Sequence, residues 1–206
     1  PNPPEPLPPN PTPPEPGTRT KYFVKGVPVT VRTERVSYIG SDGKLITESL
    51  KDYSRKTVRS EFASLNEFLT AWGQADRKQV VIDELSAKGV FFDDLAKQVG
   101  KEFDAFDLLC HVAFDQPPLT RKERAQKVKK RNVFGQYGEQ AREVLEALLM
   151  KYADSGIKSV ESMEILKIPP LSEMGTPIEI IKYFGDKTSY LNAVKQLETA
   201  IYEEVV

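Results

Sequence analysis

The residues of this sequence that could do chemistry lie together in one stretch, residues 104–131. The stretch contains the only His of the chain, His111, and the only Cys, Cys110. Asp104 and Asp107 precede His111 by seven and four residues, so a helix would place all three side chains on one side. There the carboxylates could orient His111 as a general base, and the three residues are a candidate site for a cryptic metal-dependent nuclease.

We favour a structural ion network for these residues, since such networks shift pKa values without serving catalysis. In that network the two carboxylates favour the charged form of His111 or bind Arg121 and Arg124, which follow a Pro-Pro pair. No Ser or Thr is obviously placed as a nucleophile for His111. Cys110 and His111 should not act as a nucleophile pair, because neighbouring helical residues point about 100° apart. Cys110 lies on the apolar face of the predicted helix, so we expect a buried thiol.

Composition excludes several other kinds of site. One His and one Cys cannot build a zinc site of the usual Cys/His type or a facial triad with two His ligands. The segment at residues 40–44 is too short for a Walker A loop and indicates a hairpin turn. We therefore predict no catalytic, metal-binding or cofactor-binding residue in this chain.

The end of the same stretch, residues 121–131, is strongly basic, with seven Lys or Arg against one Glu. As a helix it would present a band of positive charge that neutralises phosphates without reading sequence, or that docks an acidic protein surface. A solvated helix face is the third alternative. The candidate residues for binding nucleic acid or a partner are Arg121, Lys122, Arg124, Lys127, Lys129, Lys130 and Arg131.

The chain as a whole has no basic character, since its net charge is -1 over 206 residues. Any attraction to nucleic acid must therefore be local. A hydrophobic content of 39% is ordinary for a globular protein. The sequence has no apolar run of about 18 residues and no signal-peptide pattern, so we expect a bacterial cytoplasmic protein without a membrane partner. Because it begins with Pro rather than Met, we expect a piece of a longer protein.

Residues 1–17 are predicted to be a linker, because ten of the first sixteen residues are Pro and such chains form extended spacers. A docking ligand for an SH3-like domain is the alternative. Residues 18–206 are then predicted to form one domain. In it, residues from about 21 to 48 should form an antiparallel sheet of two or three strands, since Val residues alternate with other types.

Two turn sequences divide the predicted strands. Lys25-Gly26 is one, and Asp42-Gly43 is typical of a two-residue hairpin turn in which both positions accept positive φ. Pro28 should place its strand at an edge of the sheet, because Pro cannot donate a backbone hydrogen bond.

The chain is predicted to be helical from about residue 51 to 204. Capping boxes are expected at residues 64–67 and 176–179, and a further helix over residues 76–88. Two helices carry apolar stripes at helical spacing. Their members are Ala141, Val144, Leu145, Leu148, Leu149 and Tyr152 in one helix, and Leu191, Val194, Leu197 and Ile201 in the other. The predicted fold class is mainly α, a helical domain with a small N-terminal antiparallel hairpin or sheet.

Several segments, in this order, resemble one known family. They are FVKGVPV (23–29), DGKLITESLKDYSRKTV (42–58), FLTAW (68–72), FDAFDLLCHVAF followed by PPLTRKERA (103–125), VLEALLMKYADSGI (144–157) and GTPIEIIKYFG (175–185). The chain resembles, over about residues 22–202, the C-terminal domain of the restriction (motor) subunit of type I restriction-modification enzymes of the EcoKI and EcoEI kind.

This resemblance implies a largely helical assembly domain whose partners are the methyltransferase core of modification and specificity subunits, and the motor and nuclease domains of the same chain. ATP-dependent DNA translocation and endonuclease activity then belong to the parent subunit and lie outside this sequence. The parent complex would use ATP, Mg²⁺ and S-adenosylmethionine. The resemblance assigns no contact residue, and an independent non-specific DNA-binding module remains the alternative function.

Overall fold

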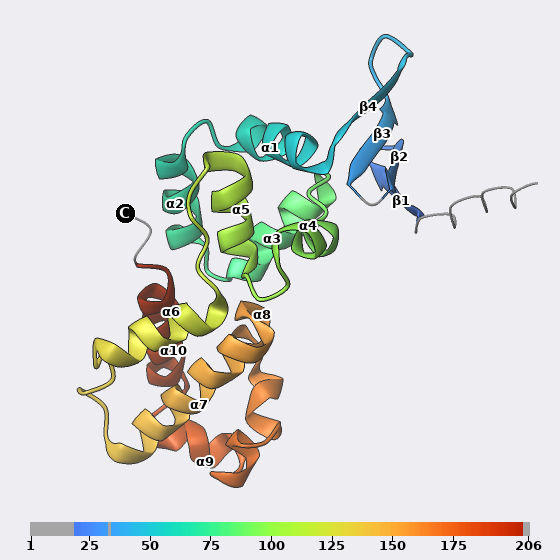
Figure 1. The fold of residues 1–206 in the computed structure, drawn as a ribbon. Coiled ribbons are helices and arrows are strands. Elements are labelled where there is room, and N and C mark those ends of the chain that lie inside the picture. The colour runs from blue at the N-terminus through green and yellow to red at the C-terminus, as the bar shows by residue number, and fades with distance from the viewer. Residues whose placement is uncertain (1–18, 33, 204–206) are drawn as a thin grey trace, which may run out of the picture. The chain divides into compact units, whose positions relative to one another are not determined.

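The computed structural model describes residues 19–32 and 34–203, so the predicted linker and its boundary with the next domain lie outside the described residues. The chain divides into two compact units, Pro1–Leu50 and Lys51–Val206. The first contains the described strands, and the helices follow from Leu50 onward (Figure 1). The predicted fold class, mainly α with a small N-terminal antiparallel sheet, is confirmed.

The described residues of the first unit form a four-stranded antiparallel sheet in the order β1-β2-β3-β4. The prediction of two or three strands was too small. The pairing brings Val31 opposite Val36, and both side chains are buried. The strands are β1 (Arg19–Val24), β2 (Val27–Arg32), β3 (Arg35–Ile39) and β4 (Leu45–Ser49).

The turn predicted at Lys25-Gly26 is confirmed, and the two-residue turn predicted at Asp42-Gly43 is not. Lys25 and Gly26 form the two-residue turn between β1 and β2, with φ of 49° and 79°. Asp42 and Gly43 lie in a longer loop, residues 40–44, so the predicted two-residue turn there is wrong. The Asp42 carboxylate accepts a hydrogen bond from the backbone N–H of Lys44 (3.1 Å), which favours a local Asx turn over the tight hairpin.

Pro28 lies in β2, which is a central strand, so the prediction of an edge strand is wrong. Its place within the strand explains why Pro is tolerated. Pro28 is opposite Phe23 of β1, and the pairing of β2 with β3 begins one residue later, at Val29. β3 therefore does not extend as far as Pro28. The N–H that Pro28 lacks would point to the side of β2 where β3 is absent, so no hydrogen bond between strands is lost.

The second unit is built of helices that begin and end at recognisable caps. Thr176 and Glu179 form the predicted capping box, with Pro177 at the first helical position. The Ser64 side chain accepts from the backbone N–H of Glu67, as predicted, but the Glu67 carboxylate accepts from the residue before Ser64. The helices are α1 (Leu50–Glu61), α2 (Leu65–Gln74), α3 (Lys78–Ala87), α4 (Phe92–Val99), α5 (Ala105–Phe114), α6 (Arg121–Lys130), α7 (Glu139–Ser155), α8 (Ile157–Glu161), α9 (Pro177–Lys182) and α10 (Lys187–Tyr202), with short 3₁₀ helices η1 (Met163–Lys167) and η2 (Leu171–Glu173).

Helix α7 lies at the centre of its neighbours and packs against α6, α8 and α10. All six members of its predicted apolar stripe are buried. In α10 the predicted stripe is shifted, because Leu191 is 44% exposed and Tyr190 takes the buried position. Tyr190, Val194, Leu197 and Ile201 follow the helical repeat, and all four are buried.

Helix α5 has no separate polar face, contrary to the prediction. Its side chains are buried on nearly all sides, and among them are Asp107 and Cys110. Asp104, the residue at its N-terminal cap, is buried too. The carboxylates therefore need partners inside the protein. No helix in residues 19–32 or 34–203 is both long enough and apolar enough to cross a membrane.

Candidate interaction site on helix α6

The start of α6 is fixed by a second capping box, which the sequence analysis did not predict. The Thr120 hydroxyl accepts from the backbone N–H of Glu123 (3.2 Å), and the Glu123 carboxylate accepts from the backbone N–H of Thr120 (2.8 Å). Thr120 also forms an antiparallel bridge with Phe103, just before α5. The register of α6 is thus set against the segment that enters α5.

Arg124 of α6 and Asp107 of α5 form a buried two-point ion pair. The Arg124 Nε and Nη2 atoms donate to the two carboxylate oxygens of Asp107, at 2.6 and 2.8 Å. The two side chains are only 3% and 2% exposed. The remaining Arg124 nitrogen, Nη1, donates to the carbonyl oxygen of Ile201 in α10 (3.0 Å). One guanidinium therefore joins α6 to α5 and to α10, and we call this pair the Asp107–Arg124 clamp.

The ionisation of the clamp follows from its surroundings. Burial alone would lower the pKa of Arg124, but the hydrogen bonds and charge of Asp107 more than offset this, and the pKa of Arg124 is raised. The guanidinium also lies over two aromatic rings, 4.9 Å from the centre of Phe106 and 5.7 Å from that of Tyr202. Arg124 consequently keeps its charge, and that charge is compensated within the protein.

Asp104 lies beside the clamp but has a different partner. Its carboxylate accepts a hydrogen bond from the Tyr202 hydroxyl at the end of α10. Burial raises the pKa of Asp104, although the hydrogen bond from Tyr202 acts in the opposite direction. Burial also raises the pKa of the Tyr202 phenol well above its ordinary value. This pair is a second tie between the start of α5 and the end of α10.

The structure brings together only some residues of the predicted ion network. His111 does not join it, because its Nδ1 atom lies 3.1 Å from the carbonyl oxygen of Gln116 while the Asp107 carboxylate turns toward Arg124. Arg121 does not bind a carboxylate as predicted but donates through Nη1 to the carbonyl oxygen of Phe103 (2.8 Å). The three candidate nuclease residues are thus directed to separate partners.

The seven basic candidates divide by residue type. The guanidinium of Arg124 is enclosed, so its predicted place on a binding surface is wrong. Arg121 and Arg131 are half-buried and form hydrogen bonds within the protein. Arg131 donates to the Glu203 carboxylate (2.6 Å) and to the Ala200 carbonyl oxygen. The side chains left exposed are lysines, namely Lys122, Lys127, Lys129 and Lys130. We call these four residues the lysine face.

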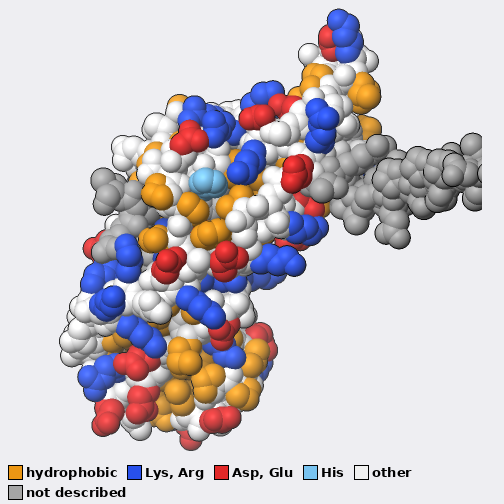
Figure 2. Space-filling view, in the orientation of Figure 1, with side chains coloured by type: hydrophobic (Ala, Val, Ile, Leu, Met, Phe, Trp, Pro, Cys, Tyr) orange, Lys and Arg blue, Asp and Glu red, His pale blue; other side chains and the backbone are white. Residues whose placement is uncertain are grey.

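The lysine face can be followed on the molecular surface. Figure 2 shows Lys and Arg side chains over the position that α6 has in Figure 1, with Asp and Glu side chains among them. The lysines supply charge without the rigid fork of Arg, which selects planar, two-point partners. The exposed charge of α6 is therefore suited to docking by attraction more than to a fixed hydrogen-bond pattern.

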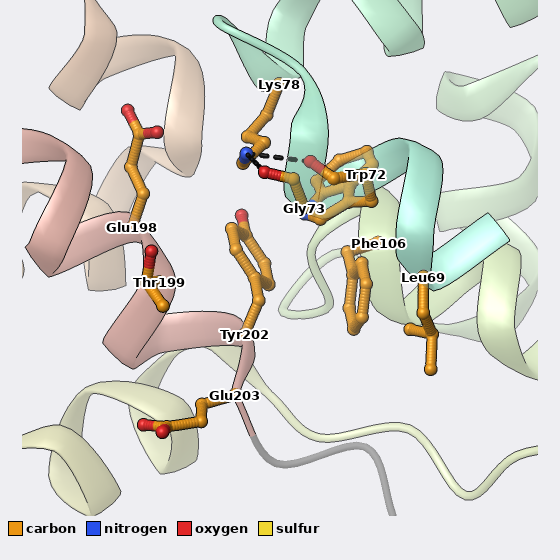
Figure 3. Close-up of a pocket in the computed structure, with 9 residues that line it drawn as sticks. All are labelled: Leu69, Trp72, Gly73, Lys78, Phe106, Glu198, Thr199, Tyr202 and Glu203. Carbon is orange, nitrogen blue, oxygen red and sulfur yellow. Dashed lines mark hydrogen bonds between the residues drawn. The ribbon is translucent and has the colours of Figure 1, made fainter. Parts of the chain in front are cut away.

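A cavity of about 270 Å³ lies next to the clamp, between α2, α5 and α10. Figure 3 shows the aromatic side chain of Tyr202 facing those of Trp72 and Phe106, while Lys78 and Glu198 supply polar groups to the lining. The Lys78 ammonium donates to the carbonyl oxygen of Trp72 (2.7 Å), which belongs to the last turn of α2. Burial raises the pKa of Glu198 to about 7. This cavity combines apolar walls with buried charge.

The family of EcoEI R protein C-terminal domains matches residues 48–202 of the chain. The chain belongs to this family. The predicted resemblance to the C-terminal domain of a type I restriction R subunit is thereby confirmed. The matched range contains the helices α1 to α10, the Asp107–Arg124 clamp and the lysine face.

The chain is also similar to the type I restriction enzyme EcoAI endonuclease subunit of Escherichia coli, with 52% identity over 184 residues. The similarity covers 89% of the chain and 23% of that subunit, so the chain spans about a quarter of the relative's length. No solved structure matches the chain.

Two polar residues that line the cavity, Lys78 and Glu198, were missed in the sequence analysis. A pattern for Glu198 exists, since it follows Leu197 directly within the apolar stripe of α10 and a charge there indicates a buried carboxyl group. No such pattern exists for Lys78, because its burial depends on where α2 ends. The last carbonyl groups of α2 need donors, and the Lys78 ammonium supplies one.

Proposed function

We propose that this chain is an assembly domain that docks a DNA-translocating restriction subunit onto the methyltransferase core of modification and specificity subunits. Its place in the EcoEI R C-terminal family supports the proposal, as does its similarity to a longer endonuclease subunit. The single observation that carries it is the division of charge on α6. The arginines hold the helix in place, and the residues of the lysine face are exposed at the surface.

Endonuclease activity and ATP-dependent translocation belong, in this proposal, to domains outside the chain. The same holds for the binding of ATP, Mg²⁺ and S-adenosylmethionine. Among the described residues no group of three or more His, Cys, Asp or Glu is placed to hold a metal ion. Asp104, Asp107 and His111 have separate partners, namely Tyr202, Arg124 and the Gln116 carbonyl, and we do not propose them as a nuclease site.

Gel filtration of the purified chain with the cognate methyltransferase tests the docking proposal. We expect the two to elute together at micromolar concentrations, and separate elution would overturn the proposal. Lys129→Glu combined with Lys130→Glu should weaken the complex and leave the thermal unfolding midpoint unchanged, because both side chains are exposed. Added salt should act in the same direction, since exposed charges are screened.

An independent non-specific DNA-binding module is the second candidate, and the lysine face is the observation that favours it. If the four exposed lysines each neutralise one phosphate, the affinity for duplex DNA falls with salt at a log-log slope of about -3.6. Fluorescence anisotropy with a labelled duplex, in the absence of methyltransferase, measures this slope. A chain that fails to bind the duplex at low salt removes this candidate.

A further inference from the structure

An apolar groove of about 150 Å³ runs between α6 and α7, within the lysine-bearing side of α6. Met150 in the groove is 54% exposed, which is high for a large apolar side chain. The residues that line the groove are Lys122, Ala125, Gln126 and Lys129 of α6 and Met150 and Ala153 of α7. The groove is thus an apolar feature with two lysines in its lining.

The two banks of the groove carry opposite charges. On α6, Lys122 and Lys129 are two turns apart and therefore lie on the same side of the helix. On α7, Glu146 and Asp154 stand one turn before and one turn after Met150, and both are exposed. A segment lying in the groove would meet ammonium groups on one flank and carboxylates on the other.

The groove is part of the fixed frame of the helical unit. Arg121 Nε donates to the Ala153 carbonyl oxygen (3.4 Å), and its Nη1 donates to Phe103, so the start of α6 is tied to α7 and to the segment before α5. Arg124 ties the next turn of α6 to α5 and α10. A groove between helices held in this way is present before any partner arrives, which lowers the entropic cost of binding.

These features favour a protein segment over a nucleic acid as the occupant. A phosphate backbone gains nothing from an apolar floor, and it would be repelled by the carboxylates along α7. A protein segment with one large apolar side chain would bury that side chain against Met150, and its own carboxylates could face Lys122 and Lys129.

We propose that the α6–α7 groove receives a large apolar side chain from the methyltransferase core, with acidic residues of the same partner segment facing Lys122 and Lys129. This inference rests on the proposed docking function and adds to it the place of contact and the chemistry of the partner segment. The apolar side chain is the anchor, and the lysines set its orientation.

Protection of an introduced thiol tests the place of contact. The Met150→Cys variant can be labelled selectively with a maleimide, because Cys110 is buried and burial raises the pKa of its thiol to about 12. Saturating methyltransferase should slow labelling at this position by about tenfold or more. Ile178→Cys on α9 is the matched control, since Ile178 is 68% exposed, and its labelling should not change.

Charge reversal tests the chemistry of the partner. Lys122→Glu combined with Lys129→Glu should raise the Kd for the methyltransferase about tenfold. Lys101→Glu combined with Lys187→Glu makes the same change of charge at exposed positions outside the groove and should leave the Kd unchanged. Equal weakening by both pairs would show an effect of net charge alone and would overturn the acidic complement.

The outcomes separate this inference from the function on which it rests. Co-elution with the methyltransferase, together with unprotected labelling of the Met150→Cys thiol, overturns the groove as the contact and leaves the docking function standing. Absence of co-elution overturns both. Protection of that thiol by duplex DNA, with none by the methyltransferase, replaces the protein partner with a nucleic acid and overturns the inference.

Discussion

Removal of one member of the Asp107–Arg124 clamp should destabilise the chain far more than loss of an exposed ion pair. Asp107→Ala deletes the acceptor of two guanidinium hydrogen bonds and of the backbone N–H of Leu119 (2.9 Å). It leaves the Arg124 charge buried without a counterion. We expect a loss of about 3–5 kcal/mol in the free energy of unfolding, a large share of the total of about 5–15 kcal/mol for a domain.

Urea denaturation followed by tryptophan fluorescence measures this loss. Trp72 is the only Trp of the chain, and its ring centre lies 5.2 Å from that of Phe106 and 5.3 Å from that of Tyr202, the two rings that Arg124 covers. Far-ultraviolet circular dichroism should give the same midpoint if unfolding is two-state. Glu164→Ala is the control. The Glu164 and Lys167 side chains form an ion pair and are 70% and 60% exposed, so this pair should contribute less than about 1 kcal/mol to stability.

The double variant decides whether the two residues act as a unit. Asp107→Leu with Arg124→Met removes both charges and supplies apolar volume, so it should lose less stability than Asp107→Ala alone. A loss below about 1 kcal/mol for Asp107→Ala would refute the reasoning. The single variants Asp107→Leu and Arg124→Met complete the comparison. A double variant whose loss of stability equals the sum of these two single losses would refute the reasoning as well, because coupled buried partners do not behave additively.

Two further predictions concern single buried groups. The pKa of Glu198 is raised from 4.5 to about 7. Between these two pH values the folded chain binds more protons than the unfolded chain. The free energy of unfolding therefore falls as the pH rises through this window, by up to about 1.4 kcal/mol per pH unit. Glu198→Gln should therefore flatten the pH dependence of the urea midpoint between about pH 5 and 8, and an unchanged slope would contradict the assignment. The Cys110 thiol, whose pKa is raised to about 12 by burial, should react with maleimide only at the rate of unfolding, and rapid labelling of the native chain in the absence of urea would disprove this.

Features that depend on neighbouring residues were predicted well from the sequence. The buried stripe of α7 and the capping box of α9 both follow from spacings of three and four residues, which the helix itself imposes. The five-residue loop at Asp42-Gly43 and the central position of Pro28 were not predictable, because each depends on how far an adjacent strand extends. The residue types indicate that a turn is present, and the pairing of the adjacent strands determines how long the loop is.

The candidate site was predicted in part for the same reason. The pairing of Asp107 with Arg124 was among the expected contacts, but the exclusion of His111 depends on which way the carboxylate turns in the folded chain. The burial of Arg124 did have a pattern in the sequence. Ala125 and Val128, the apolar residues within the basic run, mark the inward side of α6, and Arg124 stands one turn before Val128. The prediction for this run considered only its number of basic residues and so did not include the burial of Arg124.

The opposite placement of arginine and lysine on α6 gives one helix two responses to ionic strength. Salt screens the lysine face, because its charges stand in water, and it hardly reaches the Asp107–Arg124 clamp, which is sealed from ions. If α6 docks a partner as proposed, a rise in salt should release that partner while the helix stays folded and in register. Release of this kind would be reversible, because lowering the salt restores the attraction.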